Sequence, residues 1–266
     1  MSSERLEKIW EPWFEKGDYR ADFTRHLENR SRFYRLISGY LTQTAKVLEV
    51  GCGTAIDSNL LSAAFKSADF YATDISAKSV RLGRRISAQA GNRIFFIQGD
   101  INRLYFKDKI FDVIFSQGVL EHFPEAVSVV KEQVRVLQDA GVLIISVPQR
   151  YTAYTLMKKI KMYRKIWDWE WETEYSRNKL KRLGQDCGLR EIECIGYQYW
   201  RSWWEPAWVL SDFYDKFYRR LPWQGNVVSR SIKKHYDTWR QLLEQRYGMY
   251  FMQNLVIAFA KEKTTN

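Results

Sequence analysis

Short apolar runs alternate along this chain with longer amphipathic stretches, and this alternation limits the possible folds more than any other feature. Each run is rich in Val, Ile or Phe and is bounded by Gly, Asp or Pro, as is typical of strands buried on both faces. The runs cover residues 45–50, 69–74, 94–100, 111–116, 141–147, 190–198 and 254–261. Strands that alternate with helices predict an α/β fold with a mostly parallel sheet, right-handed crossovers and helices on both faces.

The segments between the runs have the spacing of helices. Residues 76–91 and 124–141 are amphipathic, and Gly141 stands where a helix C-cap would be. Residues 176–188 read as a further helix, with Ser176 as its N-cap. We therefore expect each strand to be followed by a helix that returns the chain to the same end of the sheet.

The strands and helices divide the chain into three parts. Residues 1–44 are expected to form an N-terminal helical segment, and residues 45–198 and 251–266 the sheet domain. Residues 199–250 are an aromatic-rich insertion before the last strand, too long for a hairpin loop. Its aromatics are either the core of a small helical cap or the lining of an acceptor pocket. This insertion and residues 149–175 both leave carboxyl ends of strands, where ligands bind, so both are expected to cover the site.

A glycine turn follows the first strand. The sequence reads Glu49-Val50-Gly51-Cys52-Gly53, and a helix is expected from about residue 57. Glycine lets the backbone turn tightly and approach a ligand without a Cβ in the way. The third glycine of a dinucleotide fingerprint is replaced by Ile56, and the Gly-Lys-Ser/Thr of a phosphate loop is absent. A ligand that lays a non-phosphate part against the turn fits better, although the glycines alone could simply form a strand–helix turn.

Two acidic residues stand at the ends of the next strands. Asp74 ends the run 69–74 and Asp100 ends the run 94–100, and each is followed by isoleucine, Ile75 and Ile101. A carboxylate at this edge has two oxygens that can accept hydrogen bonds from a ligand. The alternative role is that of a helix cap, which is common for an Asp after a strand.

Together, these motifs resemble those of class I S-adenosylmethionine-dependent methyltransferases. The resemblance covers roughly residues 45–198 and 254–261, with Ala55 in place of the third motif glycine. It implies a seven-stranded doubly wound sheet with the last strand antiparallel, and S-adenosylmethionine as cofactor. The cofactor-binding residues that it implies are Glu49, Gly51, Cys52, Gly53, Asp74, Ile75, Asp100, Ile101, Ser116 and Gln117. No metal site is expected.

The methyl acceptor is less constrained by the sequence. His122 follows the fourth strand and could act as general base for a hydroxyl acceptor, or it could be a packing feature. The expected acceptor is a small or lipophilic molecule, with the atom methylated left open. An RNA or tRNA methyltransferase and a non-catalytic S-adenosylmethionine-binding protein are the alternatives. Methyltransferases that act on the amino groups of bases usually carry Asn/Asp-Pro-Pro-Tyr after the fourth strand. This chain has Ser116-Gln117-Gly118-Val119 there, which argues against that activity.

Charge is uneven along the chain. The net charge is +11, and residues 1–150 carry 21 Lys/Arg against 18 Asp/Glu, whereas residues 151–266 carry 21 against 13. A basic half can attract nucleic acid, an acidic substrate or an anionic membrane surface, and the basic aromatic stretch 154–167 suggests peripheral membrane contact. Three unpaired cysteines and the absence of a signal-like N-terminus favour a cytoplasmic protein. The oligomeric state stays open.

Overall fold

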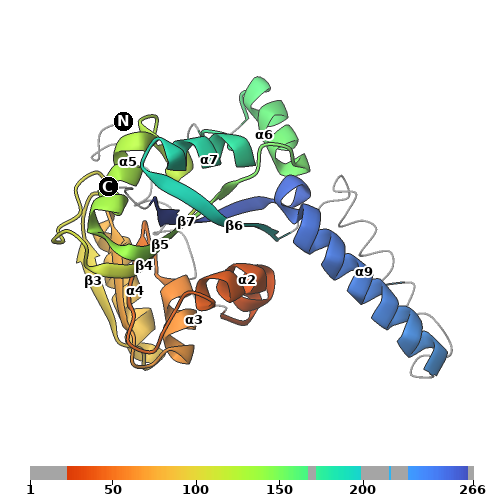
Figure 1. Ribbon diagram of the computed structural model, residues 1–266, viewed down its shortest axis with the longest axis horizontal. Coiled ribbons are helices and arrows are strands. Elements are labelled where there is room, and N and C mark those ends of the chain that lie inside the picture. Colours follow the sequence, from red (N-terminus) through yellow and green to blue (C-terminus); the bar gives the residue numbers. More distant parts are fainter. Residues whose placement is uncertain (1–22, 167–171, 199–215, 217–226, 263–266) are drawn as a thin grey trace.

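One seven-stranded sheet runs through the computed structural model, which describes residues 23–166, 172–198, 216 and 227–262 (Figure 1). The strands are β1 (Lys46–Val50), β2 (Asp69–Asp74), β3 (Ile94–Gln98), β4 (Phe111–Gln117), β5 (Leu137–Pro148), β6 (Leu189–Tyr197) and β7 (Asn254–Lys261). Their order across the sheet is β3-β2-β1-β4-β5-β7-β6. Strand β7 is antiparallel to both of its neighbours, and the other paired strands are parallel. The predicted doubly wound sheet with an antiparallel last strand is confirmed.

Helices cover both faces of this sheet. The described helices are α2 (Phe23–Ser38), α3 (Ile56–Ala64), α4 (Ala77–Gln89), the 3-10 helix η1 (Leu120–His122), α5 (Ala126–Val136), α6 (Ala153–Tyr163), α7 (Arg177–Gln185) and α9 (Val227–Phe251). Side chains alternate between the faces along each strand. In β1, Leu48 and Val50 enter the core beneath α5 and α7, whereas Val47 enters the core beneath α2 and α3. The central strands are therefore buried on both sides, as their continuous apolar runs predict.

The predicted helix 124–141 is too long at its C-terminal end. Helix α5 ends at Val136, and β5 begins directly at Leu137. Gly141 lies inside β5, so its predicted role as helix C-cap is wrong. A Cβ at Gly141 would come within 2.7 Å of the Leu137 side chain and 3.0 Å of the Asp112 carbonyl oxygen. Glycine is needed there for close packing between β4 and β5.

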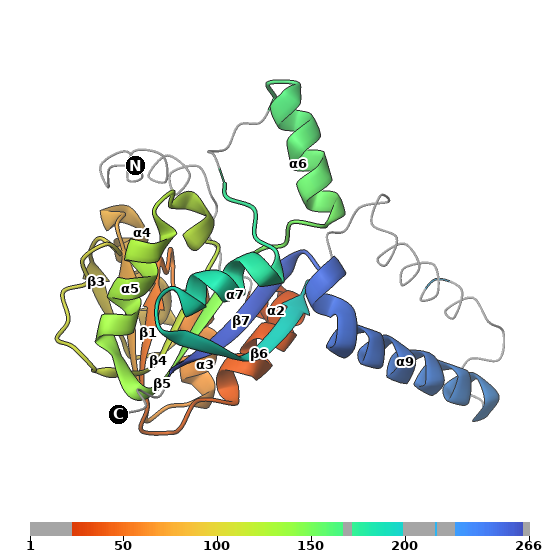
Figure 2. The same ribbon diagram turned by 45° about the horizontal axis from the view of Figure 1, so that its top comes forward.

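The N-terminal segment and the insertion are described only in part. Helix α2 packs on α3 and β6, which confirms a helix before the first strand, while residues 1–22 lie outside the described residues. Most of the insertion, residues 199–215 and 217–226, also lies outside them, including all of its tryptophans except Trp239. Helix α9 is described, and it projects from the sheet with its C-terminal end beside β6 (Figures 1 and 2).

Helix α9 meets the sheet through two glycines. A Cβ built on Gly196 of β6 would fall on the backbone carbonyl group of Gly248 in α9. Backbone atoms cannot rotate away as a side chain can, so the contact requires glycine at position 196. This pair fixes how closely the end of the insertion approaches the edge of the sheet.

The glycine contact predicts a specific stability loss. We expect Gly196→Ala to lower the free energy of unfolding by ~1–3 kcal/mol, because the added methyl group forces α9 away from β6. Arg190→Ala, an exposed position on the same strand, should change it by less than ~0.5 kcal/mol. Urea unfolding followed by circular dichroism measures both variants, and equal stability of Gly196→Ala and wild type would contradict the packing account.

Candidate functional site

A cavity of about 340 Å³ opens at the carboxyl ends of β1 to β4. Volumes of this order suit a small-molecule ligand. Ten of the eleven predicted site residues line it, namely Glu49, Gly51, Cys52, Gly53, Asp74, Ile75, Asp100, Ile101, Gln117 and His122. The exception is Ser116, which is buried within β4 and pairs in register with Val50 and Ile145. The topology of the sheet thus gathers residues from four separate motifs at one edge.

The glycine turn needs its glycines. Gly51 has φ of +65° and Gly53 has φ of +51°, both in the left-handed region that side chains disfavour. A Cβ on Gly51 would also collide with the Val119 side chain at 2.4 Å. The third motif position, Ala55, adopts φ of +53° as the residue before α3, so this departure from glycine keeps the backbone path at some cost in strain. The turn therefore presents bare backbone to the cavity.

Cys52 lies within this turn and has no sign of nucleophilic chemistry. Its backbone N–H donates to the Thr73 carbonyl oxygen at 3.0 Å, which ties the turn to β2. Burial raises the pKa of the Cys52 thiol well above its usual value, so the thiol stays protonated at neutral pH. Cys52 therefore contributes to the turn through its backbone hydrogen bond and its small side chain.

Asp74 joins the end of β2 to the glycine turn. One carboxylate oxygen accepts the Gly53 N–H at 2.8 Å, and the other accepts the Ser76 N–H at 2.9 Å. Burial raises the pKa of Asp74, and the hydrogen bonds from these two N–H groups partly offset that rise. β3 ends at Gln98, so Asp100 lies two residues beyond the strand and not at its end as predicted; it accepts both the backbone and side-chain N–H groups of Asn102 at 2.8 Å. Ser76, and not Asp74, is the N-cap of α4, and both carboxylates line the cavity.

Glu49 is a buried acceptor beneath the turn. It receives hydrogen bonds from the Ser58 backbone N–H at 3.0 Å and from the Ser58 hydroxyl. Burial, followed by the nearby Asp57 carboxylate, raises the pKa of Glu49. The side chain satisfies an N–H group in the first turn of α3 and so holds the glycine turn against that helix.

Residues that the sequence analysis missed complete this wall of the cavity. Helix α2 is kinked at Arg30 (φ −115°, ψ 16°), and the Arg30 guanidinium binds both carboxylate oxygens of Asp57 at 2.8 and 2.7 Å. The Tyr34 hydroxyl also donates to Asp57, at 2.5 Å. His26, Arg30 and Asp57 all line the cavity. The only hint of this cluster in the sequence was Asp57, an acidic residue in the first turn of the helix that follows the glycine turn.

The loop after β4 forms another part of the cavity wall, with Gln117, Gly118, Val119, His122 and Phe123. His122 sits at the end of η1, and burial lowers its pKa, so the imidazole is neutral at pH 7. This is the protonation state that a general base requires.

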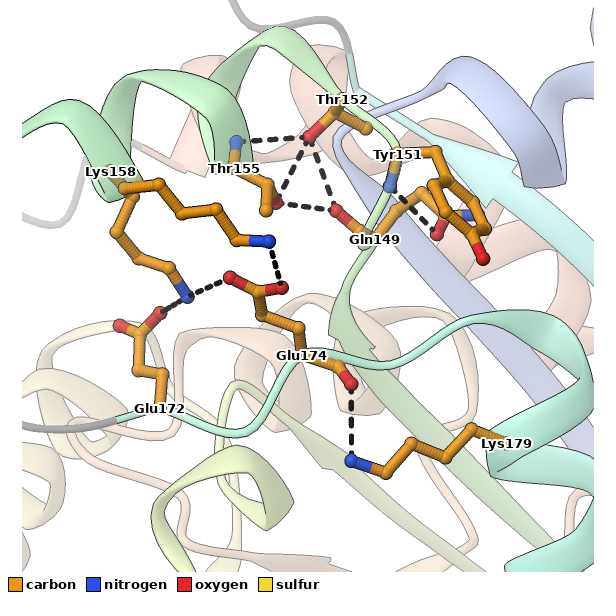
Figure 3. A network of polar contacts seen from close by, with 9 residues as sticks. Gln149, Tyr151, Thr152, Thr155, Lys158, Glu172, Glu174 and Lys179 are labelled. Atoms are coloured by element: carbon orange, nitrogen blue, oxygen red, sulfur yellow. Dashed lines mark hydrogen bonds and ion pairs between the residues drawn. The ribbon is translucent and has the colours of Figure 1, made fainter.

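A charged cluster lies behind His122. Glu121 is buried, its Oε2 atom has no hydrogen-bond partner among the described residues, and burial raises its pKa to about 8. The Glu121 carbonyl oxygen accepts the Thr173 N–H at 2.7 Å. Glu172, the residue before Thr173, forms an ion pair with the buried Lys158 of α6 at 3.0 Å (Figure 3). Helix α6 is thereby connected to the wall that holds His122.

The two elaborations do not cover the cavity within the described part of the chain. None of the described residues in 149–175 or 227–250 lines it. No group of three or more potential metal-ligating side chains occurs among the described residues, and no described helix is long and apolar enough to span a membrane.

Comparisons with known proteins show that the chain is similar to methyltransferases. A family model described as a methyltransferase domain matches residues 41–188. Demethylmenaquinone methyltransferase of Bacillus velezensis is 27% identical, over 71% of this chain and 88% of its own. Phthiotriol/phenolphthiotriol dimycocerosates methyltransferase 1 of Mycobacterium ulcerans is 27% identical over 77% of this chain, which spans 66% of that protein.

A solved structure shares the fold over nearly the whole chain. The magnesium protoporphyrin IX methyltransferase from Synechocystis, solved with bound SAH, superposes with a TM-score of 0.64 at 14% identity, covering 98% of this chain and 100% of its own. Since the family model covers more than half of the sequence, the chain belongs to this family of methyltransferase domains and is an S-adenosylmethionine-dependent methyltransferase.

Proposed function

We propose that the cavity binds S-adenosylmethionine through nine of the ten predicted cofactor-binding residues, all except Ser116, and that the enzyme methylates a small lipophilic acceptor. Asp74 carries the proposal, because its carboxylate lies in the cavity next to the glycine turn. Its two oxygens accept the Gly53 and Ser76 N–H groups, and in this proposal the same carboxylate also accepts from the ribose hydroxyls. In this proposal Ile75 and Ile101 contact the adenine ring, and Asp100 accepts from its amino group.

The methionine end of the cofactor would lie along the turn. Gly51 and Gly53 line the cavity with backbone atoms alone, and the Val119 side chain fills the space that a Cβ at Gly51 would need. Gln117 lines the cavity and can hydrogen-bond the amino-acid part of the cofactor. Bound S-adenosylmethionine supplies an electrophilic methyl group on a sulfonium. The chain's own task is to align the acceptor with that group and to exclude water.

The acceptor would approach from the loop after β4. Val119 and Phe123 give this wall an apolar character, and His122 is its titratable group. Such a wall suits an acceptor with an apolar body and one nucleophilic oxygen, nitrogen or carbon atom. Relatives are named for demethylmenaquinone and for phthiotriol dimycocerosates, which supports an acceptor of lipid-like chemistry.

His122 would remove a proton when the acceptor is a hydroxyl group. Its imidazole is buried at the cavity wall and is neutral at pH 7, since burial lowers its pKa. The negative charge of the Glu172 carboxylate raises the pKa of the same imidazole. It would therefore stabilise the imidazolium that forms when His122 takes the proton.

Cofactor affinity tests the role of Asp74. We expect Asp74→Ala to raise the Kd for S-adenosylmethionine by ~10–100-fold, because hydrogen bonds to a charged acceptor are lost. Isothermal titration calorimetry measures it. The matched control is Asp69→Ala, at the opposite end of the same strand, where the carboxylate pairs with Arg93 at the surface. Unchanged affinity of a folded Asp74→Ala protein would refute the proposed cofactor site.

Turnover tests the role of His122. We expect His122→Ala to lower kcat by ~10²–10⁴-fold while the Kd for S-adenosylmethionine stays unchanged. Transfer of labelled methyl groups is measured with whichever acceptor gives turnover in a panel of hydroquinones and hydroxylated lipids. The control is His235→Ala, an exposed histidine on α9.

The pH profile of the same reaction gives a second test. The base form of His122 is neutral, and burial lowers the pKa. Turnover should therefore be full at neutral pH and fall only as the pH drops below the ordinary pKa of imidazole. Equal kcat for His122→Ala and wild type, or a flat acid limb in the wild type, would remove His122 from the mechanism.

A further inference from the structure

Helix α6 has its polar and apolar faces reversed. A surface helix in water normally turns apolar residues to the core and polar ones to solvent. Here Thr155 and Lys158 are buried at 2% exposure each, whereas Leu156, Ile160 and Tyr163 are 62%, 51% and 91% exposed. These three positions are spaced by four and three residues, so they form one stripe along the outer face.

The buried face is fixed by ion pairs and hydrogen bonds. The buried Lys158 binds Glu172 at 3.0 Å and Glu174 at 3.9 Å, and the exposed Lys159 binds Glu174 at 3.0 Å from the edge of this face. At the start of the helix, the Thr152 hydroxyl accepts the Thr155 N–H at 3.3 Å (Figure 3). Breaking a buried ion pair is costly, so these contacts hold the helix in the orientation that turns its apolar stripe outward.

Cations flank this stripe. Residues 150–166 contain six Lys/Arg and no Asp/Glu. Lys161, Arg164 and Lys165 are exposed near the C-terminal end of α6, where Met162 and Ile166 are exposed too. Figures 1 and 2 show that α6 projects from the body of the molecule, so its tip is accessible. An exposed apolar stripe bordered by positive charge matches an anionic lipid surface in both polarity and charge.

We propose that α6 docks on an anionic lipid bilayer, with Leu156, Ile160 and Tyr163 inserted at the interface and Lys161, Arg164 and Lys165 at the headgroups. Helix α6 follows directly from the carboxyl end of β5, the edge of the sheet where the cavity opens. Docking therefore brings that edge near the membrane. The inference concerns binding alone and does not depend on the identity of the acceptor.

Vesicle sedimentation tests the proposal on the full chain. We expect sedimentation with vesicles of phosphatidylcholine and phosphatidylglycerol at low salt, weaker binding at high salt, and little binding to phosphatidylcholine alone. Ile160→Glu should lower the partition coefficient by ~10-fold or more, because it removes inserted apolar area and adds an anion. Leu242→Glu is the matched control, since Leu242 is an exposed leucine on α9.

The role of charge is tested with two double variants that change the net charge by the same amount. The double variant Lys161→Glu/Arg164→Glu should lower the partition coefficient by ~10-fold or more and remove most of its salt dependence. The double variant Lys66→Glu/Lys107→Glu changes two exposed lysines elsewhere and should bind nearly as well as wild type.

The docking surface would be overturned by no sedimentation with either vesicle at low salt, or by equal losses in the α6 variants and their controls. Binding to tRNA that depends on Lys161 and Arg164, without vesicle binding, would also overturn it in favour of a nucleic-acid surface. Titration of S-adenosylmethionine into the same variants reports on the cofactor cavity independently, and its affinity should stay unchanged.

Discussion

The hydrogen bond between the Gly53 N–H and the Asp74 carboxylate is the contact around which the cavity is organised. Strand β1 lies between β2 and β4, so the chain must turn at its carboxyl end without blocking the edge that all three strands share. The left-handed backbone at Gly51 and Gly53 makes that turn, and the Val119 side chain fills the space that a Cβ at Gly51 would need. Asp74 then holds the turn open toward the cavity.

A second buried cluster secures the turn from below. Glu49 and Asp57 are two carboxylates close together in the interior, and Arg30 of α2 pairs with Asp57 and lowers the pKa of Glu49 by its positive charge. Two buried anions without that cation would be strongly unfavourable. The N-terminal helix is therefore part of the cavity wall as well as of the core, which gives α2 a role that exceeds the covering of one sheet face.

Local pattern was enough to predict much of this arrangement. The apolar runs identify the strands because both faces of the sheet are buried, and the acids at positions 74 and 100 were placed at the shared edge because parallel strands end there together. The exact start of β5 was missed, because Gly141 is equally compatible with a helix C-cap and with a tightly packed strand. Arg30 was missed because its partner, Asp57, is 27 residues away in sequence. The reversed faces of α6 were missed for the same reason: the buried position of Lys158 depends on Glu172 and Glu174, and helical spacing alone suggests that its lysines face water.

The central claim is that the turn at 51–53 and the carboxylates of Asp74 and Asp100 form one cofactor site. A crystal structure of the protein with S-adenosylhomocysteine tests it most directly. The account predicts that the ribose hydroxyls lie within hydrogen-bond distance of Asp74, with the adenine between Ile75 and Ile101 and the amino-acid part along the glycine turn. Density for the compound at another place, or an empty cavity at a saturating concentration, would contradict it.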